Sequence, residues 1–406
     1  MPSAPAPTRA DAEALDRADP LARFRDRFVG LDGSAYLMGN SLGPLPAATE
    51  DRLAAFTREG WGGRRVEGWD EWLDLPTRVG DRVGRLVGAG PGQVVVGDST
   101  TVQLHKLLHA GLSGRPDARA VAVAADEFPT DRYVVDGVAA ARDLEVRVVP
   151  LDGRDGPVAA DAVARTCADG AVGVVVTSLV RYRTGARADM AAVSAAAHAA
   201  GALVLWDLSH AVGAVPLALD ADGADLAVGC TYKYLNAGPG APALAYRARR
   251  HAHLHQPIHG WFGQVDQFAM DAAYAPQPDA RQLLVGTPPV AGLLAVDEGV
   301  ALHEEAGVDA LAEVGRAQMR MVWDAATAAL LPLGVELATP ADPARRGQHL
   351  ALRHPDARAL VDALADDGVV ADHRAPDIVR LAAAPLHTRF VDLWDAVEGI
   401  RRHLAA

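Results

Sequence analysis

The chain has 406 residues, more than one compact hydrophobic core usually supports, so we expect two domains. Half of its residues are hydrophobic and 22% are charged, the balance of an ordinary globular protein. The net charge of −13 disfavours a nucleic-acid partner, and two distant cysteines predict neither a disulfide framework nor a metal site. No run of about 18 apolar residues and no signal peptide is visible, so a cytoplasmic protein without a membrane partner is expected.

Predicted strands and helices alternate from about residue 36 to residue 287. The first ten residues are expected to form a loose tail, and residues 10–28 have apolar side chains at helical spacing. Strands are predicted at 94–96, 120–125, 172–177, 202–206 and 226–229, and helices at 99–111, 130–142 and 188–200. Continuous apolar strands separated by helices predict an α/β fold with a mostly parallel sheet between helices.

The last hundred residues repeat this alternation on a smaller scale. A long helix is predicted around 289–305, strands at 349–353 and 378–382, and helices at 356–365 and 390–404. We therefore expect an N-terminal tail and helix at 1–35, a large domain at 36–300 and a small α+β C-terminal domain at 301–406.

Asp207 follows the predicted strand at 202–206. In open α/β sheets ligands bind at the carboxyl ends of the strands, which is where Asp207 would lie. A carboxylate there can pair with a cationic ring nitrogen, as a pyridinium electron sink requires. The alternative is an aspartate that only caps the next helix.

Lys233 follows the predicted strand at 226–229, between Tyr232 and Tyr234. Aromatic neighbours can partly desolvate a lysine and favour the neutral amine that forms imines. The chain has only two lysines, Lys106 and Lys233, and arginine does not form imines. Taken alone, Lys233 would be interpreted as a surface lysine in a loop.

Residues 97–101 join a predicted strand to a helix start and contain three hydroxyl side chains. Free backbone N–H groups, hydroxyls and the helix dipole together make an anion site, although helix capping explains the hydroxyls equally well. An aspartate, an imine-forming lysine and an anion site, each at the end of a strand, predict a pyridoxal phosphate (PLP) enzyme acting on an amino acid.

The chain also resembles the kynureninase family, which consists of PLP enzymes of fold type I related to class V aminotransferases. The matching motifs follow the family order along the chain and argue against coincidence. They lie at 36–44, 68–69, 98–101, 128–131, 182–185, 206–210, 232–236, 260–263 and 286–289.

The resemblance implies a role for each matching residue around the cofactor ring. Lys233 would carry the imine linkage, and Asp207 would pair with the pyridine nitrogen. His210 would stand beside Asp207, Phe128 would stack on the ring, and Asp131 would lie near its polar edge.

The resemblance also implies a phosphate site, a substrate site and a homodimer. The residues assigned to the phosphate are Thr100, Thr101, Tyr232 and Trp261. Trp261 and a further cofactor-binding residue, Thr287, would reach across a dimer interface. The residues assigned to the substrate are Arg380, which would grip its α-carboxylate, Trp69, Asn40 and Ser41. A bidentate guanidinium suits carboxylate binding. The alternatives are a surface arginine at 380 and a core tryptophan at 69.

The family reaction hydrolyses the Cβ–Cγ bond of kynurenine, or of a ring-substituted kynurenine, to an anthranilate and alanine in tryptophan catabolism. Lys233 would take the Cα proton, and the hydroxyl of Tyr232 is a reasonable proton donor. Both residues and Asp207 are therefore predicted to be catalytic.

Three residues depart from the family pattern: Arg181, Gln264 and His387. Arg181 would bind a second acidic group of a substrate or pair with a nearby carboxylate. The alternative function is a lyase of secondary metabolism that performs β-elimination on a cysteine conjugate, or decarboxylation with deamination. A silent PLP-fold binding protein is a third reading, against which the intact Asp207–Lys233 pair argues.

Overall fold

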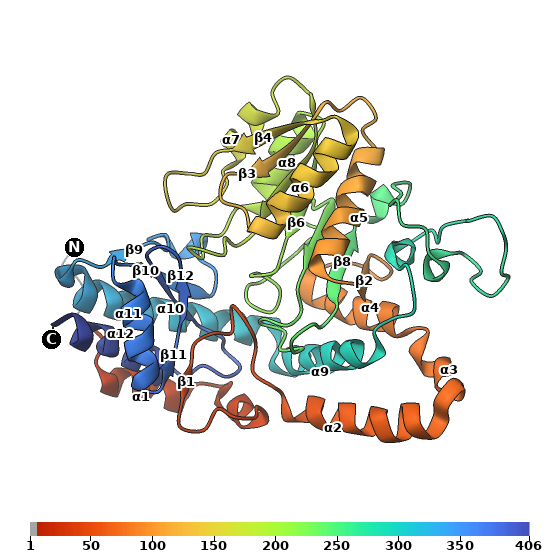
Figure 1. The fold of residues 1–406 in the computed structure, drawn as a ribbon. Helices are drawn as coiled ribbons and strands as arrows, with labels where there is room; N and C mark the ends of the chain where they lie inside the picture. Colours follow the sequence, from red (N-terminus) through yellow and green to blue (C-terminus); the bar gives the residue numbers. More distant parts are fainter. Residues whose placement is uncertain (1–5, 406) are drawn as a thin grey trace.

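The structure, a computed structural model, describes residues 6–405 of the chain. Its largest element is a seven-stranded sheet in the middle of the molecule (Figure 1). The strands are β2 (Val94–Gly97), β3 (Ala120–Ala124), β4 (Glu145–Val149), β5 (Val172–Ser178), β6 (Leu203–Asp207), β7 (Leu226–Gly229) and β8 (Ala243–Arg247). Their order across the sheet is β2-β8-β7-β6-β5-β3-β4.

The sheet is parallel except for β8, which runs antiparallel to both β2 and β7. This confirms the predicted mostly parallel sheet. Two strands were not predicted from the sequence: β4, which is partly exposed, and β8. Strand residues alternate between two hydrophobic clusters, as the period of two in a pleated strand requires. In β2, for example, Val95 belongs to one cluster, while Val94 and Val96 belong to the other.

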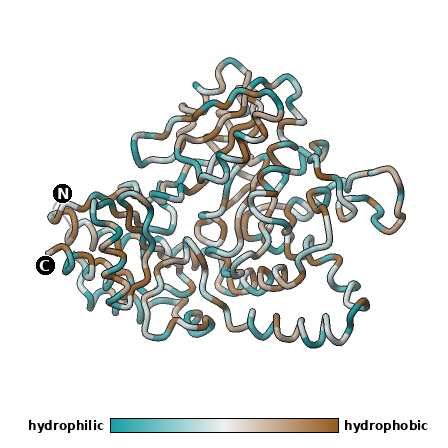
Figure 2. The backbone as a smooth tube through the Cα atoms, viewed as in Figure 1, coloured by the Kyte–Doolittle hydropathy of each residue, from teal (hydrophilic) through white to brown (hydrophobic). Residues whose placement is uncertain are grey.

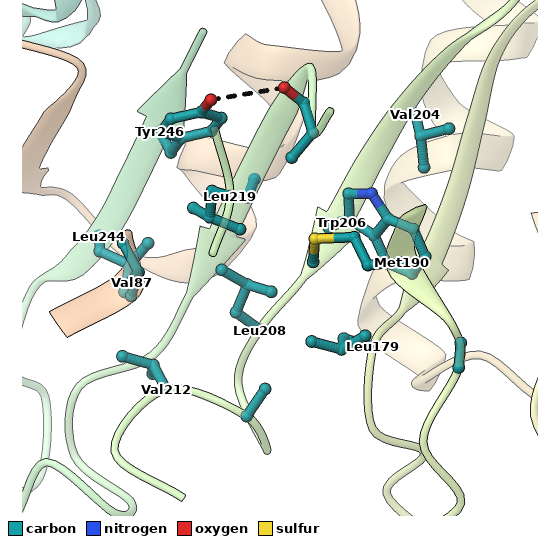
Figure 3. Close-up of a cluster of buried hydrophobic side chains, with 14 of the residues drawn as sticks. Val87, Leu179, Met190, Val204, Trp206, Leu208, Val212, Leu219, Leu244 and Tyr246 are labelled. Carbon is teal, nitrogen blue, oxygen red and sulfur yellow. Dashed lines mark hydrogen bonds between the residues drawn. The ribbon is translucent and has the colours of Figure 1, made fainter. Parts of the chain in front are cut away.

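Helices cover both faces of this sheet. One face packs against α5 (Thr100–Ser113) and α6 (Pro129–Arg142). The other packs against α4 (Leu75–Val87), α7 (Ala160–Thr166), α8 (Met190–Ala199) and α9 (Val290–Ala306). Figure 3 shows part of this second layer, where Trp206 of β6 lies beside Met190 of α8. Figure 2 shows hydrophobic residues concentrated along the central strands.

A second, smaller unit is built on a four-stranded antiparallel sheet of order β12-β13-β10-β9. Its strands are β9 (Glu336–Leu337), β10 (His349–Arg353), β12 (Asp372–Arg374) and β13 (Ile378–Ala382). Its helices are α10 (Val308–Leu330), α11 (Ala357–Asp366) and α12 (Phe390–Ala405). The sequence analysis missed α10, which follows α9 after Gly307 at a positive φ of 83°.

The N-terminal segment packs onto this smaller unit rather than standing apart from it. The predicted helix over 10–28 is shorter: α1 (Arg9–Ala18) ends before Pro20, which disfavours helical geometry in the residue before it. Ala12 and Phe24 share a hydrophobic core with Leu393 and Val397 of α12. β1 (Ala35–Tyr36) pairs in parallel with β11 (Val369–Val370). The domain boundaries at 35 and 300 stay predictions.

The segment between β1 and β2 forms an arm along the large unit. It contains α2 (Ala47–Ala55), then a π-helical stretch, then the short α3 (Trp69–Trp72). Of these, α2 packs against α9. Among residues 6–405, the helices are too short or too polar to span a lipid bilayer.

Candidate active site

A cavity of about 220 Å³ lies at the carboxyl ends of the parallel strands. It brings together most of the residues predicted to bind the cofactor. Those that line it are Thr100, Thr101, Phe128, Asp131, Asp207, His210, Tyr232 and Lys233. Ser99, part of the anion site predicted at 97–101, also lines it, together with residues that were not assigned a site role from the sequence, namely Thr130, Ser178, Tyr182, Ser209, Gly240 and Ala241.

Lys233 lies in the turn after β7 and reaches His210, with 3.0 Å between Nζ and Nε2. Its Nζ is 6.0 Å from the centre of the Phe128 ring and 5.9 Å from that of Tyr232. Burial, and then the charge of Lys233, lower the pKa of His210 well below its usual value. His210 is therefore neutral and accepts a hydrogen bond from the lysine.

The turn that carries Lys233 is fitted closely against Gly43 of the glycine-rich motif at 36–44. The N–H of Gly43 donates to the carbonyl oxygen of Tyr232 at 2.8 Å. A Cβ at Gly43 would lie 2.3 Å from the carbonyl oxygen of Lys233 and 2.3 Å from Oδ1 of Asn236. Only glycine permits this approach, so Gly43 helps fix where Lys233 lies.

Three carboxyl groups gather at one end of the cavity. Asp207, the last residue of β6, accepts a hydrogen bond from the N–H of Ser209 at 2.7 Å. Asp131 lies in the first turn of α6 and is 1% exposed. Burial, and then the negative charges of Asp207 and Glu127, raise the pKa of Asp131 well above its usual value. Glu127 was missed by the sequence analysis, because nothing in its local sequence signals that it is buried.

The amino end of α5 provides a second group of polar atoms in the cavity wall. Ser99 caps this helix by accepting from the N–H of Val102 at 3.4 Å, and Thr100 and Thr101 follow in the first turn. Asp98, before the cap, has a left-handed φ of 49° and accepts from Nζ of Lys106 at 2.7 Å. Lys106 is fully buried and also donates to the carbonyl oxygen of Leu283.

Arg380 lies on β13 of the smaller unit and is fully buried. Its guanidinium contacts the carboxylate of Asp372 and the carbonyl oxygen of Tyr182, a residue that lines the cavity. Burial lowers the pKa of Arg380 to about 10, so it remains a cation at neutral pH. Within residues 6–405, its Nε has no hydrogen-bond partner. Arg380 itself is not part of the cavity lining within one chain.

The other predicted site residues also lie outside this cavity. Trp69 is half-buried in the arm, with its ring 5.5 Å from that of Trp72. Asn40 is fully buried, and neither of its amide atoms is hydrogen-bonded to another of the described residues; Ser41 follows it. Trp261 and Thr287 are exposed on the segment between β8 and α9, which projects from the molecule (Figure 1).

The three departures from the family pattern have structural partners. Arg181 pairs with Asp126 and donates to the carbonyl oxygen of Gly156 at 2.8 Å, as the second of the two alternatives expects. Gln264 accepts from the N–H of Ala275 at 2.6 Å.

His387 is buried, with its ring 5.4 Å from that of Phe28, and burial lowers its pKa to about 3. Like Arg181 and Gln264, it does not line the cavity. The three departures therefore leave the cavity wall unchanged.

The cavity residues fit PLP on chemical grounds. The amine of Lys233 matches the aldehyde of PLP, the carboxylate of Asp207 matches its ring nitrogen, and the amino terminus of α5 matches its phosphate. Asp131 also has one buried oxygen, Oδ2, without a hydrogen-bond partner among the described residues. Buried polar atoms are rarely left unpaired, so an unpaired oxygen beside Asp207 marks a place for a polar ligand.

Comparison with known proteins agrees with this geometry. Residues 316–400 match the family model described as the kynureninase C-terminal domain. The chain is 41% identical to the kynureninase of Deinococcus radiodurans, covering 98% of this chain and 96% of that protein. It is 38% identical to the kynureninase of Pseudomonas fluorescens, covering 96% and 94% respectively.

Solved structures share the fold at low sequence identity. An apo cysteine desulfurase from Thermococcus onnurineus NA1 superposes with a TM-score of 0.80 at 13% identity, covering 95% of this chain and 98% of that one. The cysteine desulfurase CsdA from Escherichia coli gives a TM-score of 0.78 at 19% identity, covering 95% and 98%. The fold is thus PLP fold type I. With the high coverage of its sequence relatives, the chain belongs to the kynureninase family.

Proposed function

We propose that this chain uses PLP to hydrolyse the Cβ–Cγ bond of kynurenine or a ring-substituted kynurenine. Kynurenine and one water give anthranilate and alanine, so no further reactant is needed. The observation that carries the proposal is one cavity that joins Lys233, Asp207 and the start of α5, in a chain 38–41% identical to kynureninases over nearly its whole length.

Each end of the cavity has residues suited to one part of the cofactor. Asp207 would hold the ring nitrogen, Phe128 would cover a ring face, and Thr100 and Thr101 would hold the phosphate. When bound, PLP supplies an aldehyde that condenses with amines and a pyridinium ring that delocalises the electrons released at the substrate's Cα.

Lys233 is placed to move the Cα proton. Its Nζ lies 3.0 Å from His210, which stays neutral because it is buried next to this amine. A neutral imidazole can accept a hydrogen bond from the lysine without competing for its proton at neutral pH. His210 therefore orients the amine, and Lys233 removes the proton and returns it.

Tyr232 is the residue proposed to protonate the released fragment. Burial raises the pKa of its hydroxyl, so the group keeps its proton at neutral pH and can act as a donor. Tyr232 lines the same cavity as Lys233, as an acid acting on the same substrate must.

Arg380 is proposed to bind the substrate's α-carboxylate. Its contacts with Asp372 and Tyr182 fix the guanidinium plane, and its Nε donates to no other group in the part of the chain that the structure describes. Asn40, Ser41 and Trp69 are proposed to complete the substrate site. The buried amide of Asn40 has no hydrogen-bond partner among the described residues.

We propose that the chain is a homodimer in which Trp261 and Thr287 complete the partner's phosphate site. Both residues lie outside the cavity of their own chain. The projecting segment also exposes large apolar side chains, with Phe268 60% and Met270 76% exposed. Contiguous exposed apolar surface of this kind usually marks an interface.

The reaction is tested with purified protein loaded with PLP. Kynurenine and 3-hydroxykynurenine are supplied separately, and mass spectrometry measures the anthranilate product and alanine. Lys233→Ala should abolish product, while Glu313→Gln, at an exposed position on α10, should not change it. Pyruvate from a cysteine conjugate, with both kynurenines untouched, would replace this proposal with the lyase alternative.

The dimer is tested by mixing two inactive variants. A hybrid of Lys233→Ala and Trp261→Ala chains has one complete site only if Trp261 acts across the interface. Random mixing should then restore about a quarter of the wild-type activity, because half of the dimers are hybrids with one working site of two. Mixed samples that stay inactive would show that Trp261 acts within its own chain or not at all.

A further inference from the structure

Glu127 is a buried acidic residue that contacts Ser178, a residue of the cavity lining, and has no part in the reaction described above. It follows β3 and is buried beside Ser178, the last residue of β5. β3, β5 and β6 are neighbours in the sheet, and Ser178 pairs in register with Asp207. Glu127, Ser178 and Asp207 therefore form a row across the ends of three adjacent parallel strands.

Three donors hold the carboxyl group of Glu127. The N–H of Ser178 donates to Oε2 at 2.6 Å, and the N–H of Phe128 donates to Oε1 at 3.0 Å. The hydroxyl of Ser178 also donates to Oε1. Hydrogen bonds of this kind favour the carboxylate, whereas burial favours the neutral acid. Burial dominates, helped by the charge of Asp207, and raises the pKa of Glu127 to about 7.

The charges around Glu127 come from four elements. Asp207 lies on β6, Asp131 on α6, and Lys233 in the turn after β7. The fourth element is the loop after β5, whose Arg181 pairs with Asp126. Among the residues that the structure describes, no cation forms an ion pair with Glu127. A charge on Glu127 therefore interacts mainly with Asp131, with Asp207 and with a ligand that these two aspartates bind.

We propose that Glu127 is an electrostatic positioning residue, which acts through Ser178 and Asp207 to set how strongly the site holds a proton on the bound cofactor. The inference rests on the proposed use of PLP. An ionised Glu127 adds a negative charge next to Asp207 and stabilises a cation at the ring. A neutral Glu127 removes that stabilisation, so the cofactor's affinity for protons follows the state of this side chain.

The test is a pH titration of the visible absorbance of the PLP-loaded protein, which reports protonation of the lysine-bound cofactor without any substrate. Glu127→Gln keeps the shape of the side chain and removes its charge. The midpoint of the titration should fall by about one pH unit, the effect expected of one nearby charge in a partly buried site. Glu313→Gln, the same change at an exposed position, should leave the midpoint where it is.

Ser178→Ala provides a second arm that keeps the acid. It removes one hydrogen bond to the carboxylate, so Glu127 is more often neutral and the midpoint should move part of the way toward that of Glu127→Gln. The double variant should behave like Glu127→Gln alone, because Ser178 is proposed to act through the acid. If Glu127→Gln does not fold, the shift in Ser178→Ala decides.

A visible band that titrates identically in the wild type, Glu127→Gln and Ser178→Ala would overturn the role of Glu127 and leave the proposed function intact. A protein that takes up no PLP and shows no visible band would overturn both. A midpoint that rises in Glu127→Gln would also refute the inference, since loss of a negative charge cannot strengthen binding of a proton.

Discussion

Lys106 should contribute more to stability than any exposed charge of the chain. Its ammonium is fully buried, 2.7 Å from Asp98, and also donates to the carbonyl of Leu283. Lys106→Met keeps most of the apolar stem but leaves both acceptors without their donor. Removing one partner of a buried ion pair typically costs 3–5 kcal/mol. The side chain of Asp98 is 27% exposed and can be partly hydrated, so we expect about 3 kcal/mol, the lower end.

Urea denaturation followed by circular dichroism measures this loss. Arg316→Met, which removes an exposed charge from α10, is the matched control and should stay within about 0.5 kcal/mol of wild type. Adding Asp98→Asn to Lys106→Met should recover at least about 1 kcal/mol, because the unpaired carboxylate is gone and asparagine tolerates a positive φ. A loss below about 1 kcal/mol in Lys106→Met, or no recovery in the double variant, would refute the reasoning.

Further predictions concern the turn at Gly43, the ring nitrogen, the substrate carboxylate and a buried histidine. Gly43→Ala should lower the free energy of unfolding by about 2 kcal/mol in urea, because its Cβ meets the Lys233 turn, whereas Gly137→Ala, with open space around it, should not. Asp207→Asn should reduce kynurenine turnover at least ~100-fold, measured by anthranilate release from protein that retains PLP. Arg380→Lys should raise KM at least ~30-fold and leave the cofactor absorbance unchanged, because lysine lacks the planar fork; an unchanged KM would remove Arg380 from the substrate site. His387 has a pKa of about 3 when folded, well below the ordinary value of 6.5, so its contribution to stability is lost as pH falls below about 6.5. Between pH 7 and 5, His387→Phe should therefore lose about 2 kcal/mol less than wild type in urea denaturation, and an equal loss would contradict this.

The sequence predicted the layers of the fold because buried parallel strands are short apolar runs between helices. β6 and β7 are recognisable on this basis, and so are the residues that follow them, Asp207 and Lys233. β8 was missed because its apolar segment follows a Gly- and Pro-rich loop. It is also antiparallel to its neighbours, and local patterns do not reveal strand direction. α10 was missed although its buried apolar residues recur at helical spacing.

The site shows the same limit at the level of single residues. Lys233 stands out in the sequence because the chain has only one other lysine. Glu127 does not stand out, because its burial depends on Ser178, which is 51 residues away in the chain and adjacent only in the sheet. The residues of the projecting segment could be assigned from motif order, but Trp261 and Thr287 lie outside the cavity of their own chain, and no local pattern specifies the second chain that we propose brings them to it.

The pairing of α1 with α12 has a consequence for how the chain folds as it is made. α1 packs against α12, so elements from opposite ends of the described residues 6–405 lie side by side (Figure 1). During synthesis the apolar face of α1 can pack only after α12 has been made, while the central sheet can already assemble. Because α1 and α12 are neighbours, linking them and opening the chain at an exposed loop tip should preserve the fold.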